Sequence, residues 1–292
     1  MSGASEKAPI DRRFTLQTGT DPQLSAGALW WGPGDPQMQL GPDRLARAMR
    51  LASGPATLVV AWRGSRVTAQ AWGEGATEAL DLAPGLVGDL DDAPALVAHH
   101  PIVGELARRL PGLRLTRGAP VVEMLVNSII GQKVTGLEAR RSQRLLLAQL
   151  GEPAPGPCRL RVLPPPEQLA RIPYWAFHPL GLERRRADTI RAAAAIAPRL
   201  EQIRYMTADD ARRRLESVPG VGPWSAHYLM MRSYGFLDCV PVGDTGLTSG
   251  LKEFFALDVR PDKVETLALM ERFSPYRSLA TFHLWQRHGT AA

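Results

Sequence analysis

The apolar residues of this 292-residue chain follow one period before about residue 95 and another after it, and this change constrains the fold most. Residues 55–62 (PATLVVAW) and 66–72 (RVTAQAW) alternate apolar and polar side chains across a short connection that contains glycine. Such a pattern predicts a β-hairpin. Residues 13–17 also read as a strand, whereas residues 42–51 (PDRLARAMRL) read as a short amphipathic helix. The sequence therefore predicts a mixed α/β domain over residues 1–95.

From about residue 99 onward the apolar residues recur with the period of an α-helix. The positions i, i+3, i+4, i+7 and i+8 of one segment are all apolar, as on a buried helix face: Val122, Leu125, Val126, Ile129 and Ile130. Thr207 and Asp210 have the spacing of a helix N-cap. Further helices are expected at residues 134–150, 183–196, 207–218, 247–255 and 277–288, and from about Trp224. The second part of the chain is thus predicted to be mainly α.

The charge of the chain is divided in the same way. Residues 1–95 hold 8 Lys and Arg against 11 Asp and Glu, a net charge of −3, and residues 96–292 hold 27 against 18, a net charge of +9. The acidic stretch at residues 88–94 (GDLDDAP) is a candidate linker between them. A basic domain beside an acidic one favours a polyanion as partner. The alternative is an ordinary solvated surface that is rich in arginine.

Composition excludes several other classes of protein. No apolar run reaches the ~18 residues of a transmembrane helix, and the first residues (MSGASEKAPIDRR) lack the apolar core of a secretory signal. Cys158 and Cys239 are the two cysteines. Two thiols cannot supply a four-thiolate iron–sulfur cluster and do not suggest a disulfide framework. We therefore expect a protein of a reducing compartment, the cytoplasm.

The segment at residues 215–235 (LESVPGVGPWSAHYLMMRSYG) predicts a helix, a tight turn and a second helix. Pro219 fixes its own φ, while Gly220 and Gly222 permit positive φ and expose backbone amides. These amides lie at the amino end of the second helix, where the helix dipole favours an anion. A DNA phosphate fits such a site without any sequence preference. The alternative is a common corner between two helices.

The residues that follow give this segment a resemblance to a known family. Residues 240–247 read VPVGDTGL, and Asp244 lies 24 residues after Gly220. The hairpin and an aspartate at this distance resemble the helix–hairpin–helix superfamily of base-excision DNA glycosylases. Residues 125–135 (LVNSIIGQKVT) resemble the helix and turn that precede the DNA-probing loop of that family. Residues 276–285 (YRSLATFHLW) resemble the closing helix of its alkylpurine branch, the 3-methyladenine-DNA glycosylase II proteins.

The resemblance covers roughly residues 96–288 and implies a fold. It implies a mainly α protein, with two helical lobes around an active cleft and an N-terminal mixed α/β domain. The expected domains are residues 1–95 and 96–292, with the helix–hairpin–helix at about residues 207–235.

The resemblance also implies which residues act. It places Asp244 at the catalytic position, where an anion stabilises the positive charge that builds on the sugar. Bifunctional members carry a Schiff-base lysine where this chain has Trp224, and an indole cannot form an imine. Trp224, Tyr228 and Trp285 are expected to line the pocket of the flipped base, where aromatic faces attract a cationic base. Asp244 could alternatively be only a helix N-cap, and the three aromatic residues could belong to the core.

Further residues are assigned to DNA and to an ion. Gly220 and Gly222 of the hairpin are expected to contact DNA. The same is expected of Gln132 and Lys133, which lie in the turn after residue 130, here called the probing turn. Some family members place an apolar wedge at the probing turn, and the charged Lys133 departs from that pattern. No cofactor is expected to be required. The carbonyls of Glu216, Val218 and Val221 could hold a structural monovalent cation, as the family's hairpin does, although any turn presents carbonyls.

The sequence therefore predicts a monofunctional DNA glycosylase that flips out alkylated purines of the 3-methyladenine type and leaves an abasic site. The expected partner is double-stranded DNA with damaged bases, bound by a monomer in the cytoplasm at the nucleoid, without a membrane. The alternative is a catalytically silent helix–hairpin–helix module that only recognises DNA or its damage. An oxidised-purine glycosylase is disfavoured by Trp224 in the lysine position.

Overall fold

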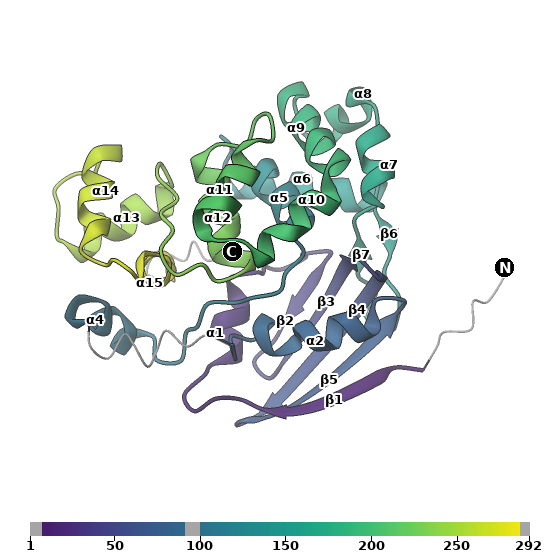
Figure 1. Ribbon diagram of the computed structural model, residues 1–292, viewed down its shortest axis with the longest axis horizontal. Helices are drawn as coiled ribbons and strands as arrows, with labels where there is room; N and C mark the ends of the chain where they lie inside the picture. The colour runs from purple at the N-terminus through teal and green to yellow at the C-terminus, as the bar shows by residue number, and fades with distance from the viewer. Residues whose placement is uncertain (1–7, 91–99, 287–292) are drawn as a thin grey trace.

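A sheet and a larger set of helices make up the structure, a computed structural model that describes residues 8–90 and 100–286. In the view of Figure 1 the sheet lies below, and the helices formed by residues 100–286 lie above it and to its left. Those helices fall into two groups in that view. The helices α5 to α12 lie over the sheet, and α4, α13, α14 and α15 lie to the left.

The sheet has five antiparallel strands in the order β1-β5-β4-β3-β2. The strands are β1 (Ile10–Thr15), β2 (Met38–Leu40), β3 (Arg44–Leu51), β4 (Gly54–Arg63) and β5 (Arg66–Gly73). The predicted hairpin is confirmed, because Arg63 of β4 pairs with Arg66 of β5 across a two-residue connection. Gly64 in this connection has a φ of +58°, which glycine adopts without strain. The strand expected at residues 13–17 is β1, displaced toward the N-terminus.

The helix expected at residues 42–51 is wrong, because most of this segment is strand β3. It pairs with β4 in register from Arg44–Ala61 to Leu51–Gly54, and with β2 on its other edge. Its Ala and Leu residues favour helices in isolation, but strand pairing on both edges overrides that preference. The alternation of apolar and polar residues that marks a strand was not visible in the sequence, because the charged Arg47 occupies a buried position on the same face as Leu45 and Met49.

Both faces of the sheet are covered. Helix α2 (Ala76–Leu86) packs across β1, β3, β4 and β5. A smaller cluster on β3 and β4 packs against the short hairpin of β6 (Glu152–Pro153) and β7 (Arg161–Val162). The guanidinium of Arg47 donates to the Glu123 carboxylate at 2.6 Å, and both side chains are buried. This ion pair joins the sheet to helix α5 (Val121–Ile130).

Helix α5 is the centre of the helical part. All ten of its residues are buried, and it packs against α6, α9, α10 and α12. The other helices, including short 3-10 turns, are α1 (Pro22–Gly27), α4 (Pro101–Arg109), α6 (Gly136–Gln149), α7 (Pro166–Arg171), α8 (Tyr174–Phe177), η1 (His178–Leu180), α9 (Arg184–Ala195), α10 (Ala197–Glu201), η2 (Gln202–Tyr205), α11 (Ala208–Glu216), α12 (Pro223–Ser233), α13 (Thr245–Phe254), α14 (Lys263–Glu271) and α15 (Arg277–Gln286).

These helices confirm the helical segments expected after residue 99, with ends displaced by a few residues. Thr207 caps α11 by accepting the Asp210 amide, as its spacing indicated. Thr135 and Glu138 form a full capping box at the start of α6. Residues 91–94 of the candidate linker, the boundary at residue 95, and residues 287–288 of the last helix lie outside the described residues. None of the helices in the described ranges is long and apolar enough to cross a membrane.

Candidate active site

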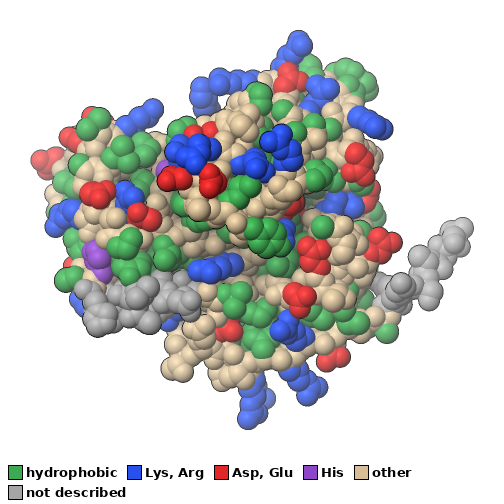
Figure 2. All heavy atoms as spheres, viewed as in Figure 1, with side chains coloured by type: hydrophobic (Ala, Val, Ile, Leu, Met, Phe, Trp, Pro, Cys, Tyr) green, Lys and Arg blue, Asp and Glu red, His purple; other side chains and the backbone are tan. Residues whose placement is uncertain are grey.

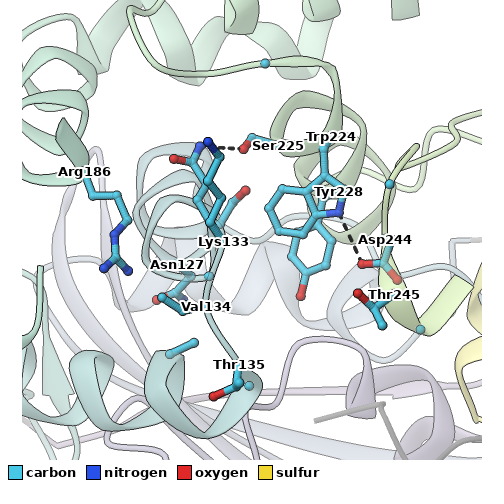
Figure 3. A pocket seen from close by; sticks show the side chains of 18 of the residues that line it. Asn127, Lys133, Val134, Thr135, Arg186, Trp224, Ser225, Tyr228, Asp244 and Thr245 are labelled. Atoms are coloured by element: carbon cyan, nitrogen blue, oxygen red, sulfur yellow. Dashed lines mark hydrogen bonds between the residues drawn. The ribbon is translucent and has the colours of Figure 1, made fainter. Parts of the chain in front are cut away.

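A cleft of about 1360 Å³ is lined by residues from both groups of helices. The hairpin after α11, the turn before α13, helix α15 and the probing turn after α5 all line it. Eight of the eleven residues assigned to a site from sequence line this one cleft: Gln132, Lys133, Gly220, Gly222, Trp224, Tyr228, Asp244 and Trp285. Figure 3 shows Trp224, Tyr228 and Asp244 on one side, with Asn127 and Arg186 opposite them.

Asp244 is both the N-cap of α13 and a carboxylate that lines the cleft. Its Oδ1 accepts the Leu247 amide at 2.8 Å, as an N-cap does. The same oxygen accepts the indole N–H of Trp285 at 2.8 Å, and Oδ2 accepts that of Trp224 at 3.2 Å. An N-cap needs only the first of these bonds. The two indole donors fix the plane of the carboxylate, which remains half-buried.

The three predicted pocket aromatics form one cluster, here called the aromatic cluster: Trp224, Tyr228 and Trp285. The rings of Trp224 and Tyr228 are stacked, with centroids 4.9 Å apart and planes at 25°. Trp285 approaches Tyr228 at 5.7 Å. Trp224 and Tyr228 are half-buried, and Trp285 is only 5% exposed. The cluster therefore packs into the core on one side and lines the cleft on the other, so the two interpretations of these residues are compatible.

The hairpin glycines differ in their backbone conformation. Gly220 has a φ of +92°, and a Cβ there would lie 2.0 Å from the Thr189 hydroxyl. Gly222 has an ordinary φ of −110° and open space around it, so of these two glycines Gly220 alone adopts the positive φ that glycine permits. Gly222 is the N-cap of α12, makes no side-chain cap, and is followed by Pro223, which has no N–H. The first turn of α12 therefore presents uncapped amides beside the cleft.

The probing turn is tied to the hairpin by Gln132. Its amide nitrogen donates to the Gly220 carbonyl at 3.1 Å and to the Ser225 hydroxyl at 2.8 Å. Lys133 is exposed and has a φ of +56°, an uncommon conformation for a residue with a side chain. A DNA contact by these two residues stays a prediction, whereas the link between the turn and the hairpin is a feature of the structure.

The possible cation site would be formed by backbone carbonyls, so the side chains around it do not test whether an ion binds there. The Val218 carbonyl accepts the Val221 amide at 3.0 Å, and a carbonyl oxygen has a second lone pair. Within residues 8–90 and 100–286, no group of three or more His, Cys, Asp or Glu side chains could hold a metal ion. A monovalent cation on the carbonyls of Glu216, Val218 and Val221 stays a prediction.

Other residues that line the cleft were not identified from the sequence. They include Trp31 of the N-terminal part, Asn127, Leu137, Arg232 and Lys263. Leu137 is a large apolar side chain, 68% exposed, in the first turn of α6. Trp31 and Lys263 come from distant segments, and no local pattern could have placed them there. Arg232 could have been found from its spacing, since it lies two helical turns after Trp224.

The cleft carries an excess of positive charge. Six Lys or Arg side chains and three Asp or Glu side chains line it. On the face of the molecule shown in Figure 2, Lys and Arg side chains are spread over the helical half and the sheet half, mixed with Asp and Glu. Burial raises the pKa of the Tyr228 phenol; Asp244 adds to this rise and Arg232 opposes it. Tyr228 is thus a neutral group between two opposite charges.

Comparisons with known proteins agree with this geometry. No protein-family model matches the chain. It is 29% identical to DNA-3-methyladenine glycosylase 2 of Escherichia coli over 203 residues, 69% of each chain. It is 26% identical to a Bacillus subtilis DNA-3-methyladenine glycosylase over 206 residues, 69% of this chain and 68% of that one. With YfjP, a further Bacillus subtilis relative, the match is 32% identical but spans only 42% of this chain and 44% of that one.

Solved structures share the fold. The 3-methyladenine DNA glycosylase of Archaeoglobus fulgidus superposes with a TM-score of 0.79 at 16% identity, over 94% of this chain and 97% of that one. Mag1 of Schizosaccharomyces pombe, in complex with abasic DNA, has a TM-score of 0.55 at 18% identity, over 64% of this chain and 90% of that one. Together with the sequence matches, this likeness identifies the group. The chain belongs to the helix–hairpin–helix DNA glycosylase superfamily, within its alkylpurine branch.

Proposed function

We propose that this protein is a monofunctional DNA glycosylase that flips alkylated purines out of duplex DNA and hydrolyses their N-glycosidic bond. One observation supports this most. The carboxylate of Asp244 lines the cleft between two indole donors of the aromatic cluster. The names of the relatives, which are DNA-3-methyladenine glycosylases, supply the class of base.

The chemistry needs an anion and a water molecule. When the glycosidic bond breaks, positive charge builds on the sugar and electrons leave with the base. A fixed carboxylate beside C1′ stabilises that charge without having to reorganise. Three N–H groups hold the carboxylate of Asp244, which leaves it one further acceptor position for a water molecule. Alkylation on a ring nitrogen makes the purine cationic and thus a good leaving group, so protonation of the base is not needed.

Trp224 sets the reaction type. It occupies the hairpin position at which a lysine would attack C1′ and form an imine. We propose that water is the nucleophile and that the product is an abasic site with both strands intact. The Trp224 ring instead offers a face on which the extruded base stacks, which offsets part of the few kcal/mol that extrusion costs.

DNA would be held by three features. The uncapped amides of α12 and the cationic side chains of the cleft suit backbone phosphates. Leu137, apolar and exposed at the cleft, suits the gap that a flipped base leaves in the stack. Lys133 then serves as a phosphate contact. We propose a monomer with the domains 1–95 and 96–292, in which the cleft between two helical lobes takes up one damaged nucleotide. A monovalent cation on the hairpin carbonyls would assist phosphate binding but take no part in bond cleavage.

Asp244→Asn tests the proposal, because asparagine keeps the shape and the helix cap but removes the charge. Base release from alkylated duplex should fall ~10²–10³-fold, while DNA binding in a gel-shift assay and the melting temperature should stay near those of the parent protein. Single-turnover excision measures the rate, and borohydride trapping reports any imine. A folded variant that excises at the parent rate would remove Asp244 from the mechanism. A parent protein that binds DNA and releases no base would establish the silent-module alternative.

A further inference from the structure

Arg232 carries a second charge into the pocket, on the side of the aromatic cluster away from the hairpin. It follows Trp224 and Tyr228 at successive helical turns of α12, so the three side chains form one column. Its guanidinium carbon lies 4.6 Å from the Tyr228 ring centroid and 5.6 Å from the Trp285 ring centroid. The side chain is only 6% exposed, yet it lines the cleft.

The partners of Arg232 are neutral. It donates to the Tyr228 hydroxyl and to the carbonyl of Ala28, which belongs to the N-terminal part of the chain. Its buried Nε has no hydrogen-bond partner among the described residues, and within the same residues no carboxylate forms an ion pair with it. Arginine cannot give up its proton in a protein. The inner side of the aromatic cluster therefore holds a permanent positive charge that has no ion-pair partner among the described residues, and the Asp244 carboxylate acts on Tyr228 with the opposite charge.

The positive charge of Arg232 affects which bases bind in the pocket that the aromatic cluster lines. A cationic base gains from aromatic faces because their π-electrons attract a positive charge. Two of the three rings of the aromatic cluster already interact in this way with Arg232. Like charges in one half-buried pocket also repel each other. A neutral purine suffers neither effect, and its carbonyl or ring nitrogen can accept a hydrogen bond from a guanidinium.

We propose that Arg232 is a specificity-determining residue that lowers the preference of the pocket for cationic purines relative to neutral ones. This inference rests on the proposed function, since it concerns the same pocket. It gives Arg232 a role in base selection in addition to its role in packing. The N-terminal part of the chain takes part in that role, because Ala28 holds the guanidinium in place and Trp31 lines the cleft three residues later.

The test compares excision of a cationic and a neutral purine from the same duplex sequence, with 7-methylguanine and hypoxanthine as the probes. Arg232→Gln removes the charge and keeps a donor for the Ala28 carbonyl. The ratio of the two single-turnover rates should shift about tenfold toward the cationic base. Arg232→Lys keeps the charge and should keep the parent ratio. An unchanged ratio in a folded Arg232→Gln variant would overturn the proposal.

Lys263→Gln is the matched charge control. Lys263 also lines the cleft but is exposed, so its loss should weaken binding of both duplexes alike and leave the ratio unchanged.

A binding measurement separates this inference from the proposed function. Tryptophan fluorescence of the parent protein is titrated with inosine and, at mildly acidic pH, with cationic 7-methylguanosine. The proposal expects the parent protein to bind the cationic nucleoside no more than about tenfold more tightly than the neutral one. Tighter binding of the cation by more than tenfold would overturn it, whether or not Arg232→Gln folds. If no base is released from any duplex, the proposed function fails, and this titration still decides the role of Arg232.

Discussion

The indole nitrogen of Trp285 lies 2.8 Å from Oδ1 of Asp244, although 41 residues separate the two in the chain. The same oxygen caps helix α13, so one atom ties the last helix of the fold to the start of α13. The position of the carboxylate is therefore set by tertiary structure as well as by its own helix. The hydrogen bond from Trp285 can be tested without a substitution of Asp244.

Trp285→Phe should slow base release by about 10–100-fold, because it removes one hydrogen bond to a charged group and keeps an aromatic ring. Single-turnover excision measures the loss, and a melting curve on the same preparation separates any loss of packing. Trp224→Phe is the companion variant. It removes the longer bond of 3.2 Å and keeps the stacking partner of Tyr228, so its effect should be smaller. Equal rates in the parent and Trp285→Phe proteins would contradict the positioning of Asp244 by this indole.

Gly220→Ala should destabilise the protein by about 1–3 kcal/mol and weaken DNA binding. A side chain at a φ of +92° is strained, and its Cβ would meet the Thr189 hydroxyl at 2.0 Å. Gly222→Ala is the matched control, because its φ is ordinary and nothing lies within 4 Å of the added carbon. Chemical denaturation of both variants gives the comparison. Similar losses for the two alanines would mean that the conformation of the hairpin does not depend on Gly220.

His283 should make the protein less stable in acid. Burial lowers the pKa of this imidazole to about 4, and Arg114 adds to the effect. The unfolded chain takes up the proton near pH 6.5 and the folded chain only near pH 4, so the free energy of unfolding falls as the pH drops through this window, by up to about 3 kcal/mol. His283→Gln should flatten the profile between these values. Denaturation midpoints across the pH range measure this difference, and parallel profiles would contradict it.

Binding to undamaged duplex should weaken steeply with salt and show little sequence preference. Four of the six cationic side chains of the cleft are not buried and could contact about three to four phosphates, which corresponds to a slope of log affinity on log salt of about −3 to −4. Fluorescence anisotropy at several salt concentrations measures the slope. Lys133→Gln and Lys263→Gln should each reduce it by about one. A slope near zero would mean that the cleft does not bind the DNA backbone.

The sequence predicted those parts of the site that belong to local patterns. The Pro-Gly turn, the aspartate after it and the helical period of α5 depend on neighbouring residues, and each lies where the spacing indicated. Strand β3 was misread because its identity depends on partners on both edges, which local propensity does not contain. Trp31 and Lys263 were missed for a similar reason, since only the tertiary fold brings them to the cleft.

The buried ion pair between Arg47 and Glu123 affects how the protein binds damaged DNA. It fastens α5 to the sheet, and α5 leads directly into the probing turn, which Gln132 in turn holds against the hairpin. These parts of the protein therefore form one stiff frame, and the duplex must supply the change of shape that brings a nucleotide to the cleft. Lesions in easily kinked surroundings, such as pyrimidine–purine steps, would then be removed sooner than the same lesions in stiff A-tracts.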